Sequence, residues 1–272
     1  MASILTNTSS MVALQTLKGI NKGMAKVQDE ISTGLKVATA KDNSSSWSIA
    51  STMNSDVSSY KKLGEALTSA SALVGVARTA AEDVAKLVKE IQTKVVQAQN
   101  PDADVPKLTA EVTVLANTIT SIAASAQYNG INLVNTGSTA ETITVSIMRS
   151  SAGALTAGTF STGVADLAAV ATAITGIADI SVAGALDTVD TQLDTVNTAA
   201  ATFGAAQARI EAQNAFLGKQ ADALKNGVGA LVDADMAEAS ARLAALQTQQ
   251  QLGIQALSIA NQAPQNVLSL FR

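Results

Sequence analysis

The sequence predicts a mainly α-helical protein: long helical hairpins and a coiled-coil-like bundle, built from discontinuous N- and C-terminal segments, with a small β-containing region in the middle. Two observations support this prediction. Apolar residues recur at alternating spacings of four and three in several long stretches, which places them along one side of a helix. Hydrophobic residues make up 47% of the 272 residues but aromatic residues only 3%, so small aliphatic side chains must supply the packing. Such side chains suit closely spaced helices.

The first predicted helix extends from Ser10 to Ile31 and carries one apolar stripe along its length. Gly34 ends the pattern, and we interpret residues 31–43, ISTGLKVATAKDN, as a spacer with defined turns. Residues 42–46 offer several N-cap side chains for a second helix, which is expected to start near residue 46. The stripe of the first helix consists of Ala13, Leu17, Ile20, Met24, Val27 and Ile31.

Two long helices separated by a reversal are predicted next. The second helix carries its apolar stripe from Met53 to Val95. The turn formers of residues 99–106, QNPDADVP, predict that the chain reverses there. The third stripe then runs from Leu108 to Ala126, which predicts a helix of that extent.

The middle of the chain is predicted to contain the β structure. The Asn-Gly pair at 129–130 should end the third helix, because this pair favours turn geometry with positive φ. Residues 142–148, TITVSIM, alternate between polar and apolar, as in a half-buried strand. Residues 150–182 are the least specified segment, with a short amphipathic stretch over 167–174 and a weak strand signal at residues 180 and 182.

A fourth stripe runs from Leu186 to Leu224 and predicts another long helix. The segment 226–235, NGVGALVDAD, predicts a break. The final helix is expected to end before Pro264. Its apolar residues are Leu243, Leu246, Leu252, Ala256, Leu257 and Ile259.

The layout is symmetric about the middle and predicts that the two ends of the chain pair with each other. The long loop that this closes is no obstacle, since loop entropy grows only logarithmically. An isolated helix of about 22 residues is marginally stable, and the C-terminal stripe is interrupted by Gln250 and Gly253 in one register. We therefore expect ends that are mobile in the monomer and become ordered against neighbouring copies. An ordinary loop between two helices of one bundle is the alternative interpretation of the spacer.

Composition excludes most kinds of catalytic site. The chain contains no cysteine and no histidine, which removes disulfides, thiolate and imidazole ligands, and His-based catalysis. We interpret the acidic pairs Glu82–Asp83 and Asp233–Asp235 as solvated faces or helix starts. No catalytic residue, no cofactor and no metal site is predicted, and the chain is not expected to be an enzyme.

Charge and hydropathy predict neither a nucleic-acid partner nor membrane insertion. The net charge is -4, and no Lys/Arg cluster exceeds the Lys61–Lys62 pair. Residues 167–178 are uncharged but shorter than the about 20 residues of a spanning helix, and residues 243–271 carry seven glutamines. The first residues, MASILTNTSS, lack a basic leader and an apolar run, so no cleaved signal peptide is expected.

Three segments of the sequence resemble bacterial flagellins. ISTGLKVATAKDNSSSWSIAS (31–51) is similar to the segment that follows the first helix in that family. AQYNGINLV (126–134) resembles the family's Phe-Asn-Gly turn, with Tyr128 in place of Phe. ANQAPQNVLSLFR (260–272) is similar to the flagellin C-terminus, and LVDADMAEASARL before it fits as well. The resemblance covers residues 1 to about 140 and 186–272.

The resemblance implies a structural subunit that self-assembles into the bacterial flagellar filament for swimming motility, through coiled-coil packing of its terminal helices. The implied organisation has five parts. Residues 1–45 are the N-terminal part of an axial core domain plus a connecting spoke, 46–140 the N-terminal part of an outer core domain, 141–185 a short variable β or loop region, 186–227 the C-terminal part of the outer core domain, and 228–272 the C-terminal part of the axial core domain.

The predicted self-assembly interface lies on the two terminal helices, and the predicted spoke residues lie between the first two helices. The interface comprises Leu17, Ile20, Met24, Val27, Ile31, Leu252, Ile259, Val267, Leu268 and Leu270. The spoke residues are Gly34, Lys36, Asp42 and Asn43.

The resemblance also implies partners and a location. The partners are other copies of this chain in a helical homopolymer, which could include sibling flagellins, together with filament cap proteins, hook-junction proteins and an export chaperone. The location is the extracellular filament, reached by type III export without a cleaved signal peptide. A hook-filament junction protein and a secreted coiled-coil adhesin stay open as alternatives.

Two departures from the family pattern carry expectations of their own. Ser46 and Trp47 replace a common Gly-Leu pair, which changes the packing expected near the spoke. Lys89 stands where many flagellins have an arginine that vertebrate innate receptors contact, which predicts weak recognition because lysine lacks the planar fork of arginine.

Overall fold

The computed structural model describes residues 7–150 and 153–269, with side chains described as far as residue 262. Within this part of the chain, six helices and four strands form. The predicted fold class, mainly α with a small β region in the middle, is confirmed. The chain divides into two compact units, one made of Met1–Asp56 with Ala223–Arg272 and the other of Val57–Asp222.

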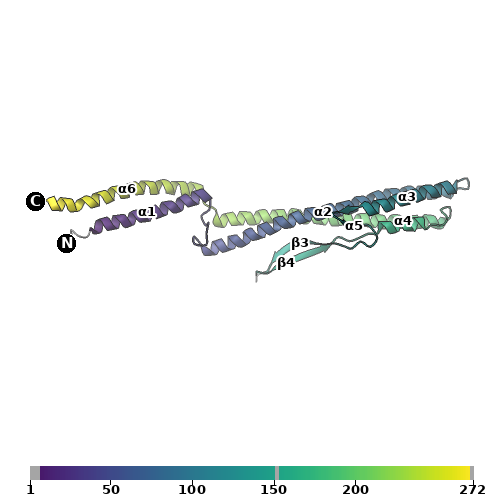
Figure 1. Cartoon of the computed structure of the whole chain (residues 1–272), viewed down its shortest axis with the longest axis horizontal. Coiled ribbons are helices and arrows are strands. Elements are labelled where there is room, and N and C mark those ends of the chain that lie inside the picture. The colour runs from purple at the N-terminus through teal and green to yellow at the C-terminus, as the bar shows by residue number, and fades with distance from the viewer. Residues whose placement is uncertain (1–6, 151–152, 270–272) are drawn as a thin grey trace. The chain divides into compact units, whose positions relative to one another are not determined.

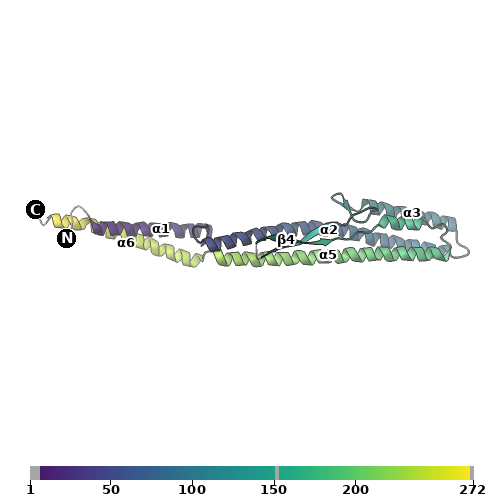
Figure 2. The same cartoon turned by 90° about the horizontal axis from the view of Figure 1, so that it is seen from below.

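The first unit is built around the helices of the two chain ends. Helix α1 (Thr8–Thr33) and helix α6 (Met236–Ser269) lie side by side and antiparallel, as both views show (Figures 1 and 2). Gly34 ends α1 in the left-handed region, with φ of 71°, and its N–H donates to the carbonyl of Glu30. Glycine adopts this conformation without the penalty that a side chain incurs. The predicted stop at Gly34 is confirmed.

The spacer after Gly34 pairs with the chain segment that leads into α6. The N–H groups of Lys36 and Val37 both donate to the carbonyl of Val232, and the N–H of Ala234 donates to the carbonyl of Gly34 at 2.9 Å. A small apolar cluster contains residues from both of these segments and from the helices next to them. It consists of Val37, Ala50, Val228 and Val232, with Leu35 and Met53 packed against it.

Asn43 starts helix α2 (Ser44–Ala98), two residues before the expected position. The Asn43 Oδ1 atom accepts from the N–H groups of Ser45 and Ser46, which satisfies donors that the first helical turn leaves free. The four-residue turn before it is closed by Asp42, whose Oδ2 atom accepts from the N–H and the hydroxyl of Thr39.

The second unit is a helical bundle formed by α2 from Val57 onward, α3 (Val105–Ser125), α4 (Leu167–Thr175) and part of α5 (Ala183–Val232). The stripes predicted on α2, α3 and α5 point into its core. The largest fully buried side chains include Leu67, Val74, Val84, Val88 and Ile91 of α2, Ile119 of α3, and Phe203 and Ile210 of α5.

Polar side chains cross the pairing of α2 with α5 and fix its antiparallel register. Tyr60 accepts from Gln220, Thr68 accepts from Asn214, and Arg78 donates to Gln207 at 2.9 Å. Each step forward along α2 is matched by a step back along α5. Hydrogen-bonded polar pairs at a helical seam specify register in the way that isolated polar core residues do in coiled coils.

Two antiparallel hairpins form the β region of the second unit. Strands β1 (Gln127–Tyr128) and β2 (Ile131–Asn132) flank Asn129 and Gly130, whose φ values of 52° and 81° confirm the predicted turn. Strand β3 (Thr142–Arg149), which was predicted, pairs with β4 (Leu155–Ser161), which was not. The Phe160 ring of β4 lies under the guanidinium of Arg209 in α5, 4.3 Å from ring centroid to Cζ, which attaches the hairpin to the bundle.

The weak strand signal at residues 180 and 182 is wrong. Ile180 is buried, but it lies in a turn that leads into α5. Asp179 explains this result, because its Oδ1 atom accepts from both the N–H and the hydroxyl of Ser181. Such a local side-chain bond stabilises a turn in place of an extended strand.

Two predicted helix ends are also corrected. The break expected over 226–235 is confined to residues 233–235, because α5 continues to Val232. Burial of Val228 and Val232 in the apolar cluster outweighs the cost of the helical glycines in this stretch. Helix α6 does not end before Pro264 but continues to Ser269. Pro264 has no backbone N–H to donate to the carbonyl of Ala260. This carbonyl accepts a hydrogen bond from the Asn7 side chain instead.

Among the helices of the described residues, none combines the length and the apolar character needed to cross a bilayer.

Candidate self-assembly surface

The apolar stripe of α1 faces α6 within the same chain. Val27 is buried, and the other stripe residues, which are Ala13, Leu17, Ile20, Met24 and Ile31, are half-buried. On α6, the least exposed residues repeat at the same alternating spacings of four and three. They are Ala239, Leu243, Leu246, Gln250, Gly253, Leu257 and Ala260.

The seam of α6 is therefore the register that contains Gln250 and Gly253. Both residues find partners on α1. The Nε2 atom of Gln250 donates to Oδ1 of Asn21 at 2.8 Å. A Cβ atom at Gly253 would lie 3.3 Å from a methyl carbon of Leu17 and 3.8 Å from one of Ile20, so the missing side chain lets the helices approach closely.

Some of the residues predicted to form the self-assembly interface lie in this seam, and others lie outside it. Leu17, Ile20, Met24, Val27 and Ile31 all lie in the intramolecular seam. Leu252 and Ile259 lie outside it and are 58% and 69% exposed. Val267 and Leu268 belong to α6, but their side chains are outside the described part of the chain, and Leu270 lies beyond the described residues.

Several large apolar residues of α1 and α6 that point away from the seam were not predicted to belong to the interface. Met11 and Val12 are 65% and 63% exposed, and Leu14 of α1 and Ile254 of α6 are exposed as well. A groove on α1 is lined by Thr8, Met11, Val12, Leu14, Gln15 and Lys18. They could have been predicted from the sequence, because they are large apolar residues at helix positions outside the four-and-three stripe that faces the partner helix. Exposed apolar residues in such numbers make the two helices a candidate interaction surface.

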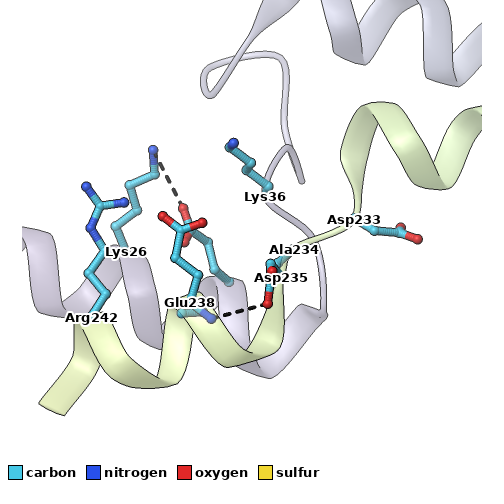
Figure 3. A pocket seen from close by; sticks show the side chains of 9 residues that line it. Lys26, Lys36, Asp233, Ala234, Asp235, Glu238 and Arg242 are labelled. Atoms are coloured by element: carbon cyan, nitrogen blue, oxygen red, sulfur yellow. Dashed lines mark hydrogen bonds and ion pairs between the residues drawn. The ribbon is translucent and has the colours of Figure 1, made fainter.

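The spoke residues have distinct positions. Gly34 supplies the left-handed turn, and Asn43 caps α2. Asp42 closes the turn through Thr39, and the backbone and hydroxyl hydrogen bonds from Thr39 lower the pKa of the Asp42 carboxyl below its ordinary value. The side chain of Lys36 lines a pocket of mixed charge (Figure 3).

That pocket lies where the spacer meets the start of α6. Two of its lining residues, Lys26 and Glu30, lie one turn apart on α1 and form an ion pair at 3.8 Å, drawn as a dashed line in Figure 3. Asp235 caps α6, because its Oδ1 atom accepts from the N–H groups of Ala237 and Glu238. The residues that line the pocket are Lys26, Glu30, Lys36, Asp233, Ala234, Asp235, Glu238, Ala239 and Arg242. Acidic and basic groups are interspersed here, which suits ion pairing along a protein surface rather than the binding of an anion.

The other acidic pair lies on the surface of α2. Glu82 is paired with Arg78, and Asp83 is paired with Lys86 at 2.8 Å. The hydrogen bond from Lys86 to Asp83 raises the pKa of the lysine. Both carboxylates are thus engaged with cations of their own helix.

Comparison with known proteins identifies the family. Residues 4–139 match the sequence pattern of the bacterial flagellin N-terminal helical region, and residues 186–271 match that of the bacterial flagellin C-terminal helical region. The chain belongs to the bacterial flagellin family. It is a structural subunit of the flagellar filament, as the sequence predicts, and this identity points to a structural protein rather than an enzyme.

Full-length relatives agree with this membership. A flagellin of Brucella melitensis is 41% identical over 282 aligned residues, covering 100% of both chains. Flagellin C of Rhizobium meliloti is 37% identical over 320 aligned residues, again covering 100% of both. Flagellin FljM of Caulobacter vibrioides is 35% identical and covers 99% of this chain and 98% of its own. Similarity to flagellins from end to end does not favour the hook-filament junction protein or the adhesin.

Proposed function

We propose that this flagellin polymerises by burying the outward apolar residues of α1 and α6 against neighbouring copies, while the seam between the two helices holds the pair together. The observation that supports the proposal is the exposure of large apolar side chains on both helices, namely Met11, Val12, Leu14, Leu252, Ile254 and Ile259. The other predicted interface residues of α6, Val267, Leu268 and Leu270, are proposed to extend this surface to the end of the chain.

Covering these outward residues would supply a substantial favourable free energy for assembly. Full burial of one large apolar side chain contributes roughly 1.5 to 3 kcal/mol. The six outward residues are on average more than half exposed, so covering them completely would contribute on the order of 5 to 11 kcal/mol per copy. Part of this gain offsets the cost of ordering the helices and of association.

The pair of terminal helices has little core of its own. Among the described residues of the two helices, Val27 of α1 and Ala239 of α6 are the ones that are buried. A two-helix layer with so small a core is marginal in isolation. Contacts with neighbouring copies would complete its burial, so filament formation and ordering of the chain ends are proposed to be coupled.

The proposal extends to the organisation of the subunit. Residues 1–45 and 228–272 would form the axial core and its spoke, residues 46–140 and 186–227 the outer core, and residues 141–185 a short surface region. The hydrogen bonds of the spacer with Val232 and Ala234 support a spoke of fixed geometry. The proposed partners are filament cap proteins, hook-junction proteins and an export chaperone. The subunit is proposed to be exported without a cleaved signal peptide and to reside in the extracellular filament.

The test is polymerisation of purified full-length protein, followed by light scattering and electron microscopy. Leu252→Asp and Ile259→Asp should abolish filaments, because each places a charge in the buried surface. Leu252→Met is the matched control, since it keeps an apolar side chain of similar volume and should polymerise normally. Circular dichroism of the monomers should show that the second unit stays folded in all three variants.

A separate variant tests the seam between α1 and α6. Leu17→Asp should also prevent filaments, but by separating α1 from α6, so that hydrogen exchange along α1 rises in the monomer. Normal filaments from Leu252→Asp and Ile259→Asp would overturn the outward surface as the site of assembly. Normal filaments from Leu17→Asp would overturn the role of the paired helices.

A further inference from the structure

Pro264 creates a specific problem inside α6. The helix continues through this residue to Ser269, yet proline has no N–H to donate to the carbonyl four residues earlier. That carbonyl belongs to Ala260, which is half-buried in the seam with α1. A carbonyl shielded from water and left without a donor would destabilise the helix at this point.

Asn7 supplies the missing donor from the other end of the chain. Its Nδ2 atom donates to the carbonyl of Ala260 at 2.7 Å. The same amide uses its Oδ1 atom to accept from the N–H of Ser10 at 3.1 Å, which makes Asn7 the N-cap of α1. One side chain therefore serves a free donor at the start of α1 and a free acceptor within α6.

A second contact joins Ser10, three residues after Asn7, to Asn261, the residue that follows Ala260. The hydroxyl of Ser10 donates to Oδ1 of Asn261 at 2.8 Å. The start of α1 is thus joined to two consecutive residues of α6. Other side chains that cap helices cannot reproduce the first contact, since an aspartate in place of Asn7 would cap equally well but has no hydrogen to donate to Ala260.

We infer that Asn7 is a positioning residue that sets the register of α1 against α6, by donating to the one carbonyl that Pro264 leaves free. In an uninterrupted stretch of helix every carbonyl is taken by the N–H four residues later. A pair shifted by one helical turn would therefore offer Asn7 a carbonyl that is already bonded. The inference rests on the proposed function, because the correctly registered pair is the surface on which neighbouring copies pack.

The experiment is a double-mutant cycle in the full-length protein with Asn7→Asp and Pro264→Ala. Alanine at 264 restores the backbone N–H, so Ala260 no longer depends on Asn7. Asn7→Asp alone should raise the critical concentration for polymerisation about five- to tenfold, since the carbonyl of Ala260 then has no hydrogen-bond donor. In the Pro264→Ala background, the same change should raise it by less than about twofold.

The matched control is Asn21→Asp. It adds the same charge to the same helix, but its contact with Gln250 uses the Oδ1 atom of Asn21 as acceptor, which an aspartate retains. Its effect on the critical concentration should be small and equal in both backgrounds. Hydrogen exchange of residues 11–20, measured in the monomers of the same cycle, gives a readout that does not require filaments.

The outcomes separate this inference from the function it rests on. An equal effect of Asn7→Asp in both backgrounds would mean that Asn7 acts only through its cap or its charge, and would overturn the inference. No effect in either background would also overturn it. Wild-type protein that does not polymerise at all would overturn the proposed function, and the monomer exchange data would then decide on Asn7 alone.

Discussion

Gly253 offers a quantitative test of the close contact between α1 and α6. The position of its missing Cβ atom is 3.3 Å from a Leu17 methyl carbon and 3.8 Å from an Ile20 methyl carbon. A methyl group at 3.3 Å requires its neighbour to shift by a few tenths of an ångström, which the flexible end of Leu17 can do at small cost. Replacing glycine by alanine within a helix gains about 1 kcal/mol of helix stability. Gly253→Ala is therefore expected to change the stability of the pair by about 0 to 1 kcal/mol in the favourable direction.

A larger side chain at the same position reverses the sign. Gly253→Leu adds three carbon atoms beyond Cβ, although the Cβ atom alone already fills the space beside Leu17. Overpacking of this kind costs typically 1 to 3 kcal/mol, which exceeds the gain in helix propensity. Because the pair has so little core, a loss of this size is expected to separate α1 from α6 in most monomers.

The control and the assay follow from the same geometry. Gly19 of α1 has no neighbouring atom within 4 Å of its missing Cβ, so Gly19→Ala should show the full gain of about 1 kcal/mol. Hydrogen exchange along α1 in the monomer reports the opening of the pair for all three variants. The reasoning is refuted if Gly253→Leu protects α1 as well as Gly253→Ala does, or if Gly19→Ala and Gly253→Leu have the same effect.

Two further predictions concern hydrogen bonds elsewhere in the chain. Arg78→Ala should lower the melting temperature of the second unit by about 2 to 4 °C, since it removes the bond to Gln207 and the ion pair with Glu82; Arg78→Lys should recover less than half of this loss in calorimetry, because an ammonium lacks the fixed fork of the guanidinium. The pKa of Asp42 is lowered by its hydrogen bonds from Thr39, so its contribution to the spacer is complete above the unfolded value of about 3.9 and is lost as the pH falls through the lower folded pKa. Protection of residues 34–43 against hydrogen exchange should therefore drop at acid pH in the wild type, and Asp42→Asn should remove this dependence.

The sequence predicted the helices because their apolar stripes are local signals that no distant contact contradicts. Val74, Val84 and Val88 could be assigned to one buried face from spacing alone, and all three are fully buried. The stop at Gly34 was equally predictable, since a glycine just past an apolar stripe favours the left-handed cap. These features depend on residues within one or two helical turns.

The register of α6 could not be predicted in this way. By hydrophobicity alone, the register of α6 that contains Gln250 and Gly253 is the weaker candidate for the seam. A register that contains Leu252 and Ile259 is the stronger candidate. The paired helix changes this judgement, because Asn21 satisfies the glutamine and Leu17 fills the space over the glycine. The information that selects the register lies more than two hundred residues away along the chain, so no local pattern contains it.

Pro264 fails as a stop signal for the same physical reason. Proline disfavours a helix interior because its ring crowds the carbonyl four residues earlier and because it leaves that carbonyl without a donor; in this chain Asn7 supplies the donor. The polar contacts made by Asn7, Asn21 and Gln250 within the mostly apolar seam are thus inferred to select its register, although they bury little area themselves. Under the proposed function, most of the free energy of assembly comes from the outward apolar residues, among them Leu252 and Ile259, which remain exposed in the isolated chain. A subunit arranged in this manner can set the geometry of its terminal helices before contact and still gain most of their stability only when a neighbour covers them.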